Sequence, residues 1–491
     1  MLRQSLKSED ISCVGRLRPA HCLFREKNVY NTSWECYIFN KKIIAGGGRM
    51  QFVYIPIGVP TFDLEVARDQ FDRSCALMRS CFGGEAVCPQ KMLLSIPDLK
   101  AFLASVDPDL IVLQNITFAN SAYCSEVVAA FPSVPLLLWT LKEPVIDGKR
   151  LRLNSLTGAY SAANVMKSLG KSSFGYVFGS PDDSDVRRAV LADACAVRTL
   201  NELRECRVAA IGTTPEGFGF GRALDSDVLR VFGSRLISVE LSEILDKAKS
   251  YSFDEFRQYL DGFCSTCCDY DHIPEKNMEG YARLMKAYSD FCEQNNVKVI
   301  GSRCWPDLFT QFGTPNCAVL SMLNDMGIAS ACESDMYGGI SMFLASRLSG
   351  KAVFFGDPVS MDEKENTVTY WHCGMCAPSL ASRPSIGVHP NRKIGPAMDF
   401  GCKACDSVTV FRIGRDADGS FRAFIARGSA LDKPKQFLGA SVVVKTEGSA
   451  KELVYGSVKD GWEPHFVVAY ADIAFELEEL CRMLGIPVCG F

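Results

Sequence analysis

The sequence has few of the features that mark membrane, secreted or nucleic-acid-binding proteins. Its longest apolar runs, such as VPLLLWTL, are far shorter than the roughly 20 residues of a membrane-spanning helix. The N-terminal residues MLRQSLKSEDIS contain no apolar core of a secretory signal peptide. The net charge is only −4 and no cluster of Lys and Arg stands out, which argues against a nucleic-acid partner. We therefore expect a cytoplasmic protein that binds neither membranes nor nucleic acids.

Cysteine, in contrast, is abundant, with 22 residues among 491. In a large chain without an export signal, these residues are expected to be mostly reduced, buried and packed as small hydrophobic groups. The chain is 47% apolar and 22% charged, an ordinary composition for a globular protein. Its length suffices for about two to four domains.

Residues 1–49 differ from the rest of the chain, because their cysteines and aromatic residues follow no clear period. They lead into the sequence IIAGGGRM, which ends at Met50. A purine-rich ribosome-binding site would read as GGGR if it were translated. Our hypothesis is that Met50 is the natural start and that 1–49 is a mis-assigned extension. The alternative is a genuine N-terminal arm.

From residue 51 onward, short apolar strands alternate with amphipathic helices. The segments LIVLQN and PLLLWT are strand-like, whereas the apolar residues of 64–82 recur at the spacing of three and four that is typical of a helix. This βαβ pattern predicts parallel sheets with helices on both faces. We predict an α/β fold with two Rossmann-like domains, at 50–170 and 171–350, and a β-rich C-terminal domain at 351–491.

Two acids stand at the ends of one strand–helix–strand segment, ACESDMYGGISMFLASRLSGKAVFFGDP. Glu333 precedes its Gly-rich helical run, and Asp357 ends its last strand. His372 and His465, two of only five histidines, lie beside strand-like runs, where α/β proteins usually place site residues. Two carboxylates and two imidazoles suit Mn²⁺, Mg²⁺ or Co²⁺ better than structural zinc. On the residues alone, a solvated Glu333, a turn at Asp357 and two surface histidines stay the alternative.

Two other patterns suggest different ligands. Cys373, Cys376, Cys402 and Cys405 form C-x2-C-x25-C-x2-C, which is close to the four-thiolate pattern of a zinc site. Because the chain is rich in cysteine, coincidence is the alternative explanation. The glycine-rich segment 216–222 follows a strand, but its third glycine does not match the dinucleotide-binding spacing. We interpret it as a flexible loop.

The segment from SRCWPDLF to TVTYWHCG resembles the L-fucose isomerase family, which is related to the L-arabinose isomerases. The separation of 24 positions between Glu333 and Asp357 matches the metal carboxylates of that family. The segment EPHFVVAYADIAFELEELCRMLGIPV resembles its C-terminal histidine segment, which adds His465 as a ligand. WHCG resembles a segment that supplies another ligand in the arabinose branch, which adds His372.

This resemblance implies an aldose–ketose isomerase that acts on a deoxy sugar, a pentose or a modified hexose with Mn²⁺ or another divalent cation such as Mg²⁺ or Co²⁺. The reaction moves a proton between C1 and C2 through a cis-enediol, and the metal acidifies the C–H bond. Glu333 and Asp357 would act as ligands and as the acid–base pair; which one removes the C–H proton is open. The family also implies a hexamer or another homo-oligomer with pockets between subunits. The C-terminal domain is shorter than in full-length fucose isomerases, so the sugar is open as well.

Sugar hydroxyls need polar partners, and the sugar ring needs an apolar or aromatic wall. The candidates for these contacts are Trp305, Arg303, Asp335, Asn366, and Trp139 with Glu143, the last two in a position to reach a neighbouring subunit's pocket. Packing or a solvated loop is the alternative for each of them. Two other functional classes also stay open, a non-catalytic sugar-binding or regulatory protein of the same fold and a zinc-stabilised, redox-sensitive CxxC scaffold.

Overall fold

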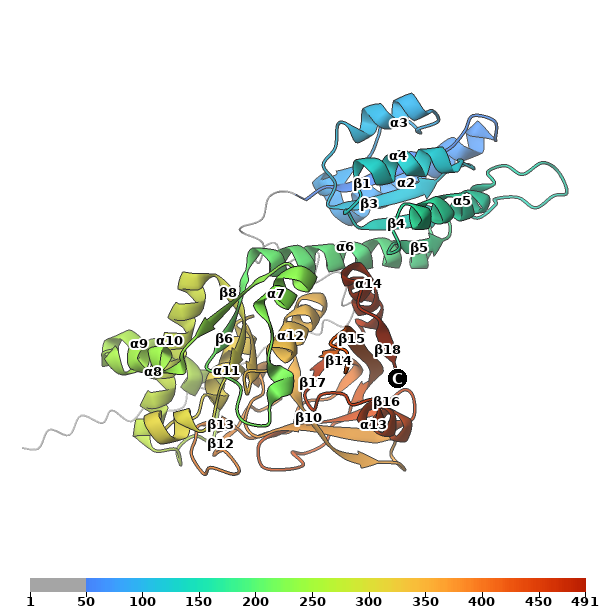
Figure 1. Cartoon of the computed structure of the whole chain (residues 1–491). Coiled ribbons are helices and arrows are strands. Elements are labelled where there is room, and N and C mark those ends of the chain that lie inside the picture. Colours follow the sequence, from blue (N-terminus) through green and yellow to red (C-terminus); the bar gives the residue numbers. More distant parts are fainter. Residues whose placement is uncertain (1–49) are drawn as a thin grey trace, which may run out of the picture.

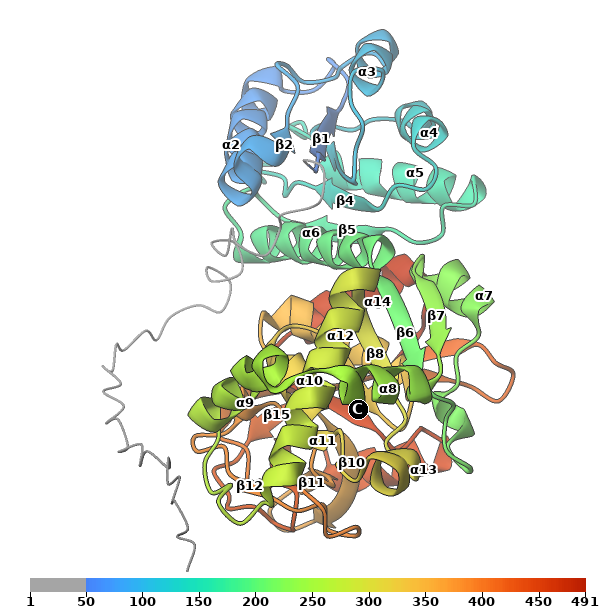
Figure 2. The same cartoon turned by 90° about the vertical axis from the view of Figure 1, so that its left-hand side faces the viewer.

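The computed structural model describes residues 50–491, so the predicted extension over 1–49 lies outside the described residues. The described chain forms two α/β domains with parallel sheets and a β-rich C-terminal domain (Figure 1), which confirms the predicted fold class. The long helix α6 (Ser184–Glu205) runs between the first domain and the other two (Figures 1 and 2).

The first domain is built on a five-stranded parallel sheet in the order β2-β1-β3-β4-β5. Helices cover both of its faces, which is why β1 and β3 are buried at every residue. Because β5 pairs with β4, the sheet continues past residue 170, and the predicted boundary there precedes the last strand of the domain. The elements are β1 (Phe52–Ile57), α2 (Leu64–Phe82), β2 (Ala86–Val87), α3 (Ile96–Leu103), β3 (Leu110–Asn115), α4 (Ser121–Ala130), β4 (Leu136–Thr140), α5 (Ser155–Ser168) and β5 (Gly175–Phe178).

The second domain has a four-stranded parallel sheet in the order β7-β6-β8-β9. In a parallel sheet the carboxyl ends of the strands share one edge, so the loops after β6, β8 and β9 lie together. The Arg303 N–H donates to the Ile211 carbonyl (2.9 Å) and the Ser334 N–H to the Ser302 carbonyl (3.1 Å), which ties these loops to one another. The elements are β6 (Arg207–Ile211), α7 (Asp225–Asp227), β7 (Arg235–Val239), α8 (Leu241–Ser250), α9 (Phe253–Thr266), α10 (Glu275–Asn295), β8 (Val297–Ser302), α11 (Cys317–Asp325), β9 (Ala329–Cys332) and α12 (Met336–Ser349).

The C-terminal domain contains a seven-stranded sheet in the order β14-β17-β10-β11-β16-β15-β18. Because β14 also pairs with β15, the sheet closes into a barrel, with β18 added outside the closure. Closure removes the exposed edges that an open sheet would present. The elements are β10 (Phe354–Asp362), β11 (Thr367–His372), β12 (Ile386–Gly387), β13 (Ala397–Met398), β14 (Cys405–Arg415), β15 (Phe421–Ala430), β16 (Ala440–Thr446), α13 (Ala450–Lys459), β17 (Phe466–Ala469), α14 (Ala474–Leu484) and β18 (Val488–Gly490).

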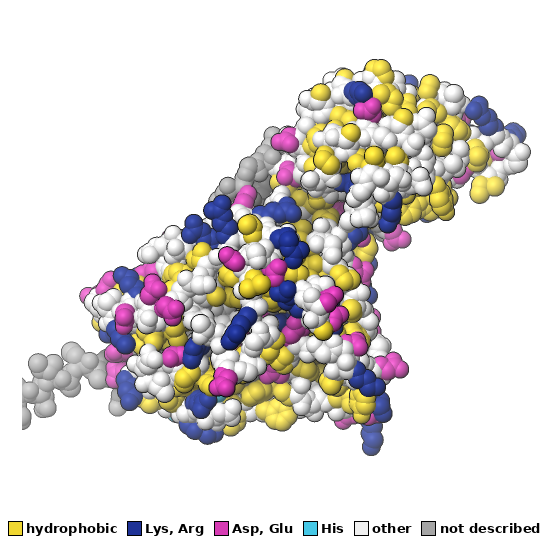
Figure 3. Space-filling view, viewed as in Figure 1, with side chains coloured by type: hydrophobic (Ala, Val, Ile, Leu, Met, Phe, Trp, Pro, Cys, Tyr) yellow, Lys and Arg dark blue, Asp and Glu magenta, His cyan; other side chains and the backbone are white. Residues whose placement is uncertain are grey.

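Two helices join the three domains. Helix α12 packs against β8 and β9 on one side and against β14 and β17 on the other, which explains why it is buried almost all round. Helix α14 packs against α6, where Arg482 Nη2 is 3.0 Å from the buried Asp193. Within residues 50–491, every helix is too short or too polar to cross a membrane. Lys and Arg are interspersed with Asp and Glu on the face shown in Figure 3.

Candidate active site

Glu333, Asp357 and His465 meet where the edge of the second sheet faces the barrel. Glu333 follows β9, Asp357 lies in β10 and His465 directly precedes β17. His465 Nε2 is 3.1 Å from Glu333 Oε2 and 3.5 Å from Asp357 Oδ1. Helix α12 carries the chain away from Glu333 and β10 returns it, so the structure brings together three of the four ligands predicted from the sequence.

The turn that presents Glu333 has an unusual backbone. Glu333 and Ser334 have φ angles of 59° and 55°, a left-handed conformation that costs a non-glycine residue about 1 kcal/mol or more. Hydrogen bonds from the Ser334 N–H to the Ser302 carbonyl and from the Asp335 N–H to the Cys332 carbonyl (3.1 Å each) hold the turn. This rigid turn directs the Glu333 side chain toward the barrel.

The second ring nitrogen of His465 is held by a buried charge pair. His465 Nδ1 is 2.9 Å from Asp335 Oδ2, and Arg412 donates to both oxygens of Asp335, at 2.5 and 3.0 Å. The Asp335 carboxylate also caps α12, because it accepts from the Gly338 N–H (2.9 Å). A carboxylate on one imidazole nitrogen fixes the ring so that the other nitrogen can act as a ligand. Asp335 is fully buried, so the suggestion that it contacts a sugar is wrong.

Electrostatics favour a cation among these groups. Burial raises the pKa of Asp357. Burial alone would lower the pKa of His465, but its contacts with Asp335 and Glu333 outweigh burial and raise that pKa to about 10. Burial would raise the pKa of Asp335, whereas Arg412 and His465 together bring it below its usual value. The raised pKa favours the protonated form of His465 in the metal-free chain, with a carboxylate beside each ring nitrogen.

The separations between these side chains suit a divalent cation. Among residues 50–491, no group of three or more His, Cys, Asp or Glu side chains already stands in the arrangement of a metal site; here His465 contacts the two carboxylates directly. Octahedral donors at about 2.1 Å from an ion lie about 3 Å apart in cis positions, and the measured separations are 3.1 and 3.5 Å. Side-chain rotations of Glu333 and Asp357, which are 16% and 34% exposed, would open a position for the ion.

His372, the fourth predicted ligand, is buried next to His465. The two ring centroids are 6.1 Å apart, and both rings pack against Phe355. Burial lowers the pKa of His372, but Cys373, Glu333 and Asp357 outweigh burial and raise it. His372 therefore lies within the electric field of both carboxylates.

A row of aromatic rings leads away from His465. The ring centroids of Phe220 and His465 are 5.5 Å apart. The Phe218 ring comes next, with its centroid 5.5 Å from that of Phe220, and the Trp305 ring follows, 6.3 Å from Phe218. Trp305 is half-buried and lies at the edge of the site, as a sugar-contacting residue must. Sequence reasoning missed the two phenylalanines, because it treated 216–222 as a flexible loop. The alternating pattern GFGFG was the available signal.

Arg303 also lies at this edge, but its charge is already paired. Its Nε is 2.7 Å from Asp307 Oδ2 and its Nη1 is 3.0 Å from Thr213 Oγ1. Gly212, in the adjoining loop, packs against the Arg303 side chain and accepts a hydrogen bond from Ser334 Oγ (3.2 Å). The loop that carries Arg303 and Trp305 therefore adjoins the Glu333 turn.

The other predicted sugar contacts are structural. Trp139 is completely buried in the first domain, where its indole N–H donates to the Gly179 carbonyl (2.8 Å), so it cannot reach a neighbouring subunit. Glu143 accepts from the Leu153 and Asn154 N–H groups. Asn366 has a φ of 57°, and its side chain bonds the backbone of residues 446, 448 and 450. The structure gives Trp139 a packing role and Glu143 and Asn366 capping roles, which strand ends and turns also require.

The four cysteines of the CxxC pairs do not converge. The sulfur atoms of Cys376 and Cys402 are 3.6 Å apart, whereas Cys373 contacts His372 (3.6 Å) and Cys405 contacts the Ser407 carbonyl (3.1 Å). Within residues 50–491 these cysteines therefore do not form a four-thiolate cluster.

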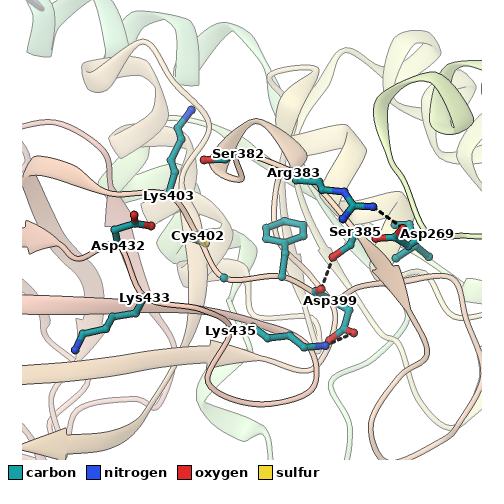
Figure 4. Close-up of a pocket in the computed structure, with 13 residues that line it drawn as sticks. Asp269, Ser382, Arg383, Ser385, Asp399, Cys402, Lys403, Asp432, Lys433 and Lys435 are labelled. Carbon is teal, nitrogen blue, oxygen red and sulfur yellow. Dashed lines mark hydrogen bonds and ion pairs between the residues drawn. The ribbon is translucent and has the colours of Figure 1, made fainter. Parts of the chain in front are cut away.

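A cavity of about 440 Å³ lies elsewhere in the C-terminal domain (Figure 4). Three of its cations already have acidic partners: Arg383 pairs with Asp269, Lys435 with Asp399 and Lys433 with Glu365. None of the four candidate ligands Glu333, Asp357, His372 and His465 lines it. The candidate active site is therefore the cluster around His465, where acids, imidazoles and aromatic rings meet.

Comparisons with known proteins agree on one family. Residues 391–491 match the family model of the L-fucose isomerase C-terminal domain. Sulfoquinovose isomerase from Clostridium sp. (strain MSTE9) is 53% identical over 437 residues, which cover 88% of this chain and 97% of that protein. Sulfoquinovose isomerase from Priestia aryabhattai is 34% identical over 443 residues, which cover 88% of this chain and 97% of that protein. Sulfoquinovose isomerase from Alkalicoccus urumqiensis is 32% identical over 442 residues, which cover 89% of this chain and 98% of that protein.

Proposed function

We propose that this chain, which belongs to the fucose isomerase-like family and is an aldose–ketose isomerase, acts on sulfoquinovose. It would convert this sugar to the corresponding ketose at the cluster of Glu333, Asp357 and His465. The observation that carries the proposal is the convergence of both carboxylates on His465 Nε2. Three relatives named sulfoquinovose isomerase support the choice of sugar. Sulfoquinovose is a 6-deoxy-6-sulfo hexose, so it falls within the modified hexoses expected from the sequence.

The proposal includes a divalent cation, Mn²⁺ or alternatively Mg²⁺ or Co²⁺. Glu333, Asp357 and His465 would hold it, and His372 is the candidate for a fourth ligand. When bound, such a cation polarises the carbonyl, acidifies the adjacent C–H bond and stabilises the developing negative charge. The Asp335–Arg412 pair would keep His465 Nε2 directed at it.

The two carboxylates are assigned to proton transfer. Conversion of the aldose requires that the C2 proton leaves and that the carbonyl oxygen at C1 gains a proton, which gives a cis-enediol. The ketose then forms when C1 accepts a proton and the O2 hydroxyl loses one. The raised pKa of Asp357 suits a group that must both accept and return a proton. The Phe220 and Trp305 rings would pack against the C–H groups of the sugar.

The experiment that tests this proposal combines metal removal with substitution. EDTA-stripped protein should isomerise sulfoquinovose only after Mn²⁺ is added, with ketose detected by NMR, and in D₂O the ketose should carry deuterium at C1. Glu333→Gln and Asp357→Asn should each lower kcat by roughly 10²- to 10⁴-fold. Glu363→Gln, an exposed acid paired with Lys451, is the control and should keep full activity. Unchanged turnover in the EDTA-stripped protein would refute the proposed metal dependence. Full activity of Glu333→Gln would refute the proposed role of Glu333 in proton transfer.

The predicted homo-oligomer is part of the same proposal. The loop between β4 and α5 projects from the first domain (Figure 1), and it carries Ile146 at 94% exposure next to Val145 at 47%, with Leu151 at 52% exposure further along the same loop. Exposed apolar side chains that lie together mark protein–protein contacts. Light scattering should give a mass above that of the monomer, and Ile146→Asp should reduce it. A monomeric wild-type protein would contradict the proposal.

A further inference from the structure

An arginine without a carboxylate partner lies at the far end of the aromatic row that starts at His465. The guanidinium carbon of Arg392 is 5.7 Å from the ring centroid of Trp305 and 6.0 Å from that of Phe309. Within residues 50–491, no Asp or Glu forms an ion pair with it. Arg392 is exposed, so its N–H donors are available to a ligand.

The backbone around Arg392 is fixed. The N–H groups of Asn391 and Arg392 approach His389 Nδ1 at 3.2 and 3.3 Å. The Lys393 N–H donates to the His389 carbonyl at 2.8 Å. His389 is itself buried, and its ring packs edge-on against Phe309 at 5.3 Å. A loop held in this way presents Arg392 from a defined position, as a specific binding group requires.

A second, independent route connects this loop to the candidate active site. Cys373 Sγ is 3.6 Å from His372 Nδ1, and the ring centroid of His372 is 6.1 Å from that of His465. The next residue, Gly374, accepts a hydrogen bond at 2.9 Å from the N–H of Met398, which lies in β13, the strand that follows the Arg392 loop. The aromatic row reaches Arg392 from the second domain, whereas this route reaches it through the C-terminal domain. Both routes connect the Arg392 loop to His465.

We propose that Arg392, held against Trp305, binds the sulfonate group of the substrate. The inference rests on the proposed function, because it assigns a recognition group within that site. The reacting carbons, C1 and C2, belong at the carboxylates, so C6 with its permanently charged sulfonate lies at the opposite end of the sugar. A guanidinium offers two parallel N–H donors to two oxygens of such an anion. An aromatic face beneath the guanidinium keeps its plane in place without neutralising its charge.

Two other arginines at this edge are less suited to the role. Arg303 already pairs with Asp307 at 2.7 Å, so an anion would have to compete with that carboxylate. Arg222 donates through Nε to Thr214 Oγ1 at 2.7 Å. Arg222 lies at the end of the glycine-rich loop, and no aromatic ring orients its guanidinium among the described residues. It is therefore the second arginine to include in a test.

The test compares two sugars in the Mn²⁺-loaded protein, sulfoquinovose and its uncharged analogue 6-deoxyglucose. Arg392→Met should lower kcat/KM for sulfoquinovose by roughly 10- to 100-fold, mainly through KM, and should leave the value for 6-deoxyglucose within about twofold. Arg392→Lys should recover part of the loss. Methanesulfonate should inhibit the wild-type protein and inhibit Arg392→Met less. Arg383→Met removes an exposed arginine of the same domain that pairs with Asp269 at 2.7 Å, and it should behave as wild type with both sugars.

Each remaining outcome is decisive. If wild-type protein converts sulfoquinovose and Arg392→Met does so equally well, this inference is refuted while the proposed function stands. A selective loss in Arg222→Met instead would also refute it and would move the sulfonate to that residue. Equal losses with both sugars would show a structural role only, contrary to the proposal. If the wild-type protein converts uncharged sugars but not sulfoquinovose, both the proposed substrate and this inference fail.

Discussion

Replacing Asp335 by Asn should destabilise the protein at its most deeply buried ion pair. Asp335 and Arg412 are both fully buried, and Arg412 Nε has no hydrogen-bond partner among the described residues, so Asp335 is the main compensation for the arginine charge. Removal of one partner from a buried ion pair costs roughly 3–5 kcal/mol. Because Glu463 also raises the pKa of Arg412, though less than Asp335 does, we expect the lower end of that range, about 3 kcal/mol. That is a large share of the roughly 5–15 kcal/mol by which domains are stable.

The same change should weaken metal binding. The amide oxygen that Asp335→Asn introduces can still accept a hydrogen bond from His465 Nδ1, so the ring keeps its approximate orientation. The ring loses the neighbouring negative charge that makes His465 a better ligand, and loss of such an outer partner typically costs 10- to 100-fold in metal affinity or activity. The assays are urea unfolding of metal-free protein and calorimetric titration with Mn²⁺ under conditions where the variant is folded.

Two further variants separate the causes. Asp227→Asn breaks a partly exposed pair with Arg415 (2.7 Å); it should cost at most about 1 kcal/mol and leave Mn²⁺ affinity unchanged. Asp335→Asn combined with Arg412→Met removes both buried charges, so it should recover part of the lost stability but not the lost affinity. Asp335→Asn with wild-type Mn²⁺ affinity would refute the positioning role that we assign to Asp335, and an unchanged free energy of unfolding would refute the energetic argument.

Three other changes test separate features. A Cβ on Gly338 would lie within 2.8 Å of Phe355, Asp335 and Arg412, so Gly338→Ala should cost about 1–3 kcal/mol in urea unfolding; Gly262→Ala, in α9 with nothing within 4 Å, should instead stabilise by about 0.5–1 kcal/mol. Burial raises the pKa of Glu476 to about 7 from its ordinary value of 4.5, so the folded state loses stability as pH rises from about 4.5 through 7. Glu476→Gln should therefore raise the free energy of unfolding by up to about 3 kcal/mol at pH 8 and by far less at pH 5. An equal gain at both pH values would contradict this prediction. Cys402→Ala should leave the metal content measured by mass spectrometry unchanged, and a loss of bound zinc would show that the CxxC cysteines hold an ion after all.

The sequence was sufficient to predict the fold class and to single out the acids of the candidate site, for different reasons. The alternation of strands and helices depends on local periodicity, which any window of the chain displays. Glu333 and Asp357 stand out because each borders one strand–helix–strand unit, and His465 because histidine is scarce. The boundary near residue 170 was misplaced, since only strand pairing shows that β5 belongs to the first sheet.

The partners of His465 could not be predicted in the same way. Asp335 and Arg412 are 77 positions apart, and their contact depends on how the barrel docks against α12. The one local signal was a charged residue inside the apolar strand VTVFRIG, since a buried arginine requires an anion. For Trp139 the local signal was ambiguous, because a tryptophan at a strand end fits a hydrophobic core as well as a sugar pocket. Burial alone distinguishes the two.

The division of the proposed site between two domains would link catalysis to domain packing. Glu333 and Asp335 belong to the second domain, whereas Asp357, His465 and Arg412 belong to the barrel, so neither part contains the complete set of proposed ligands. Separation of the two parts would leave Arg412 without Asp335 and His465 without either of its nearest carboxylates. A cation shared by Glu333, Asp357 and His465 would bind only the docked arrangement and would stabilise it by mass action. Metal affinity and domain docking should therefore rise and fall together, because the same buried carboxylate supports both.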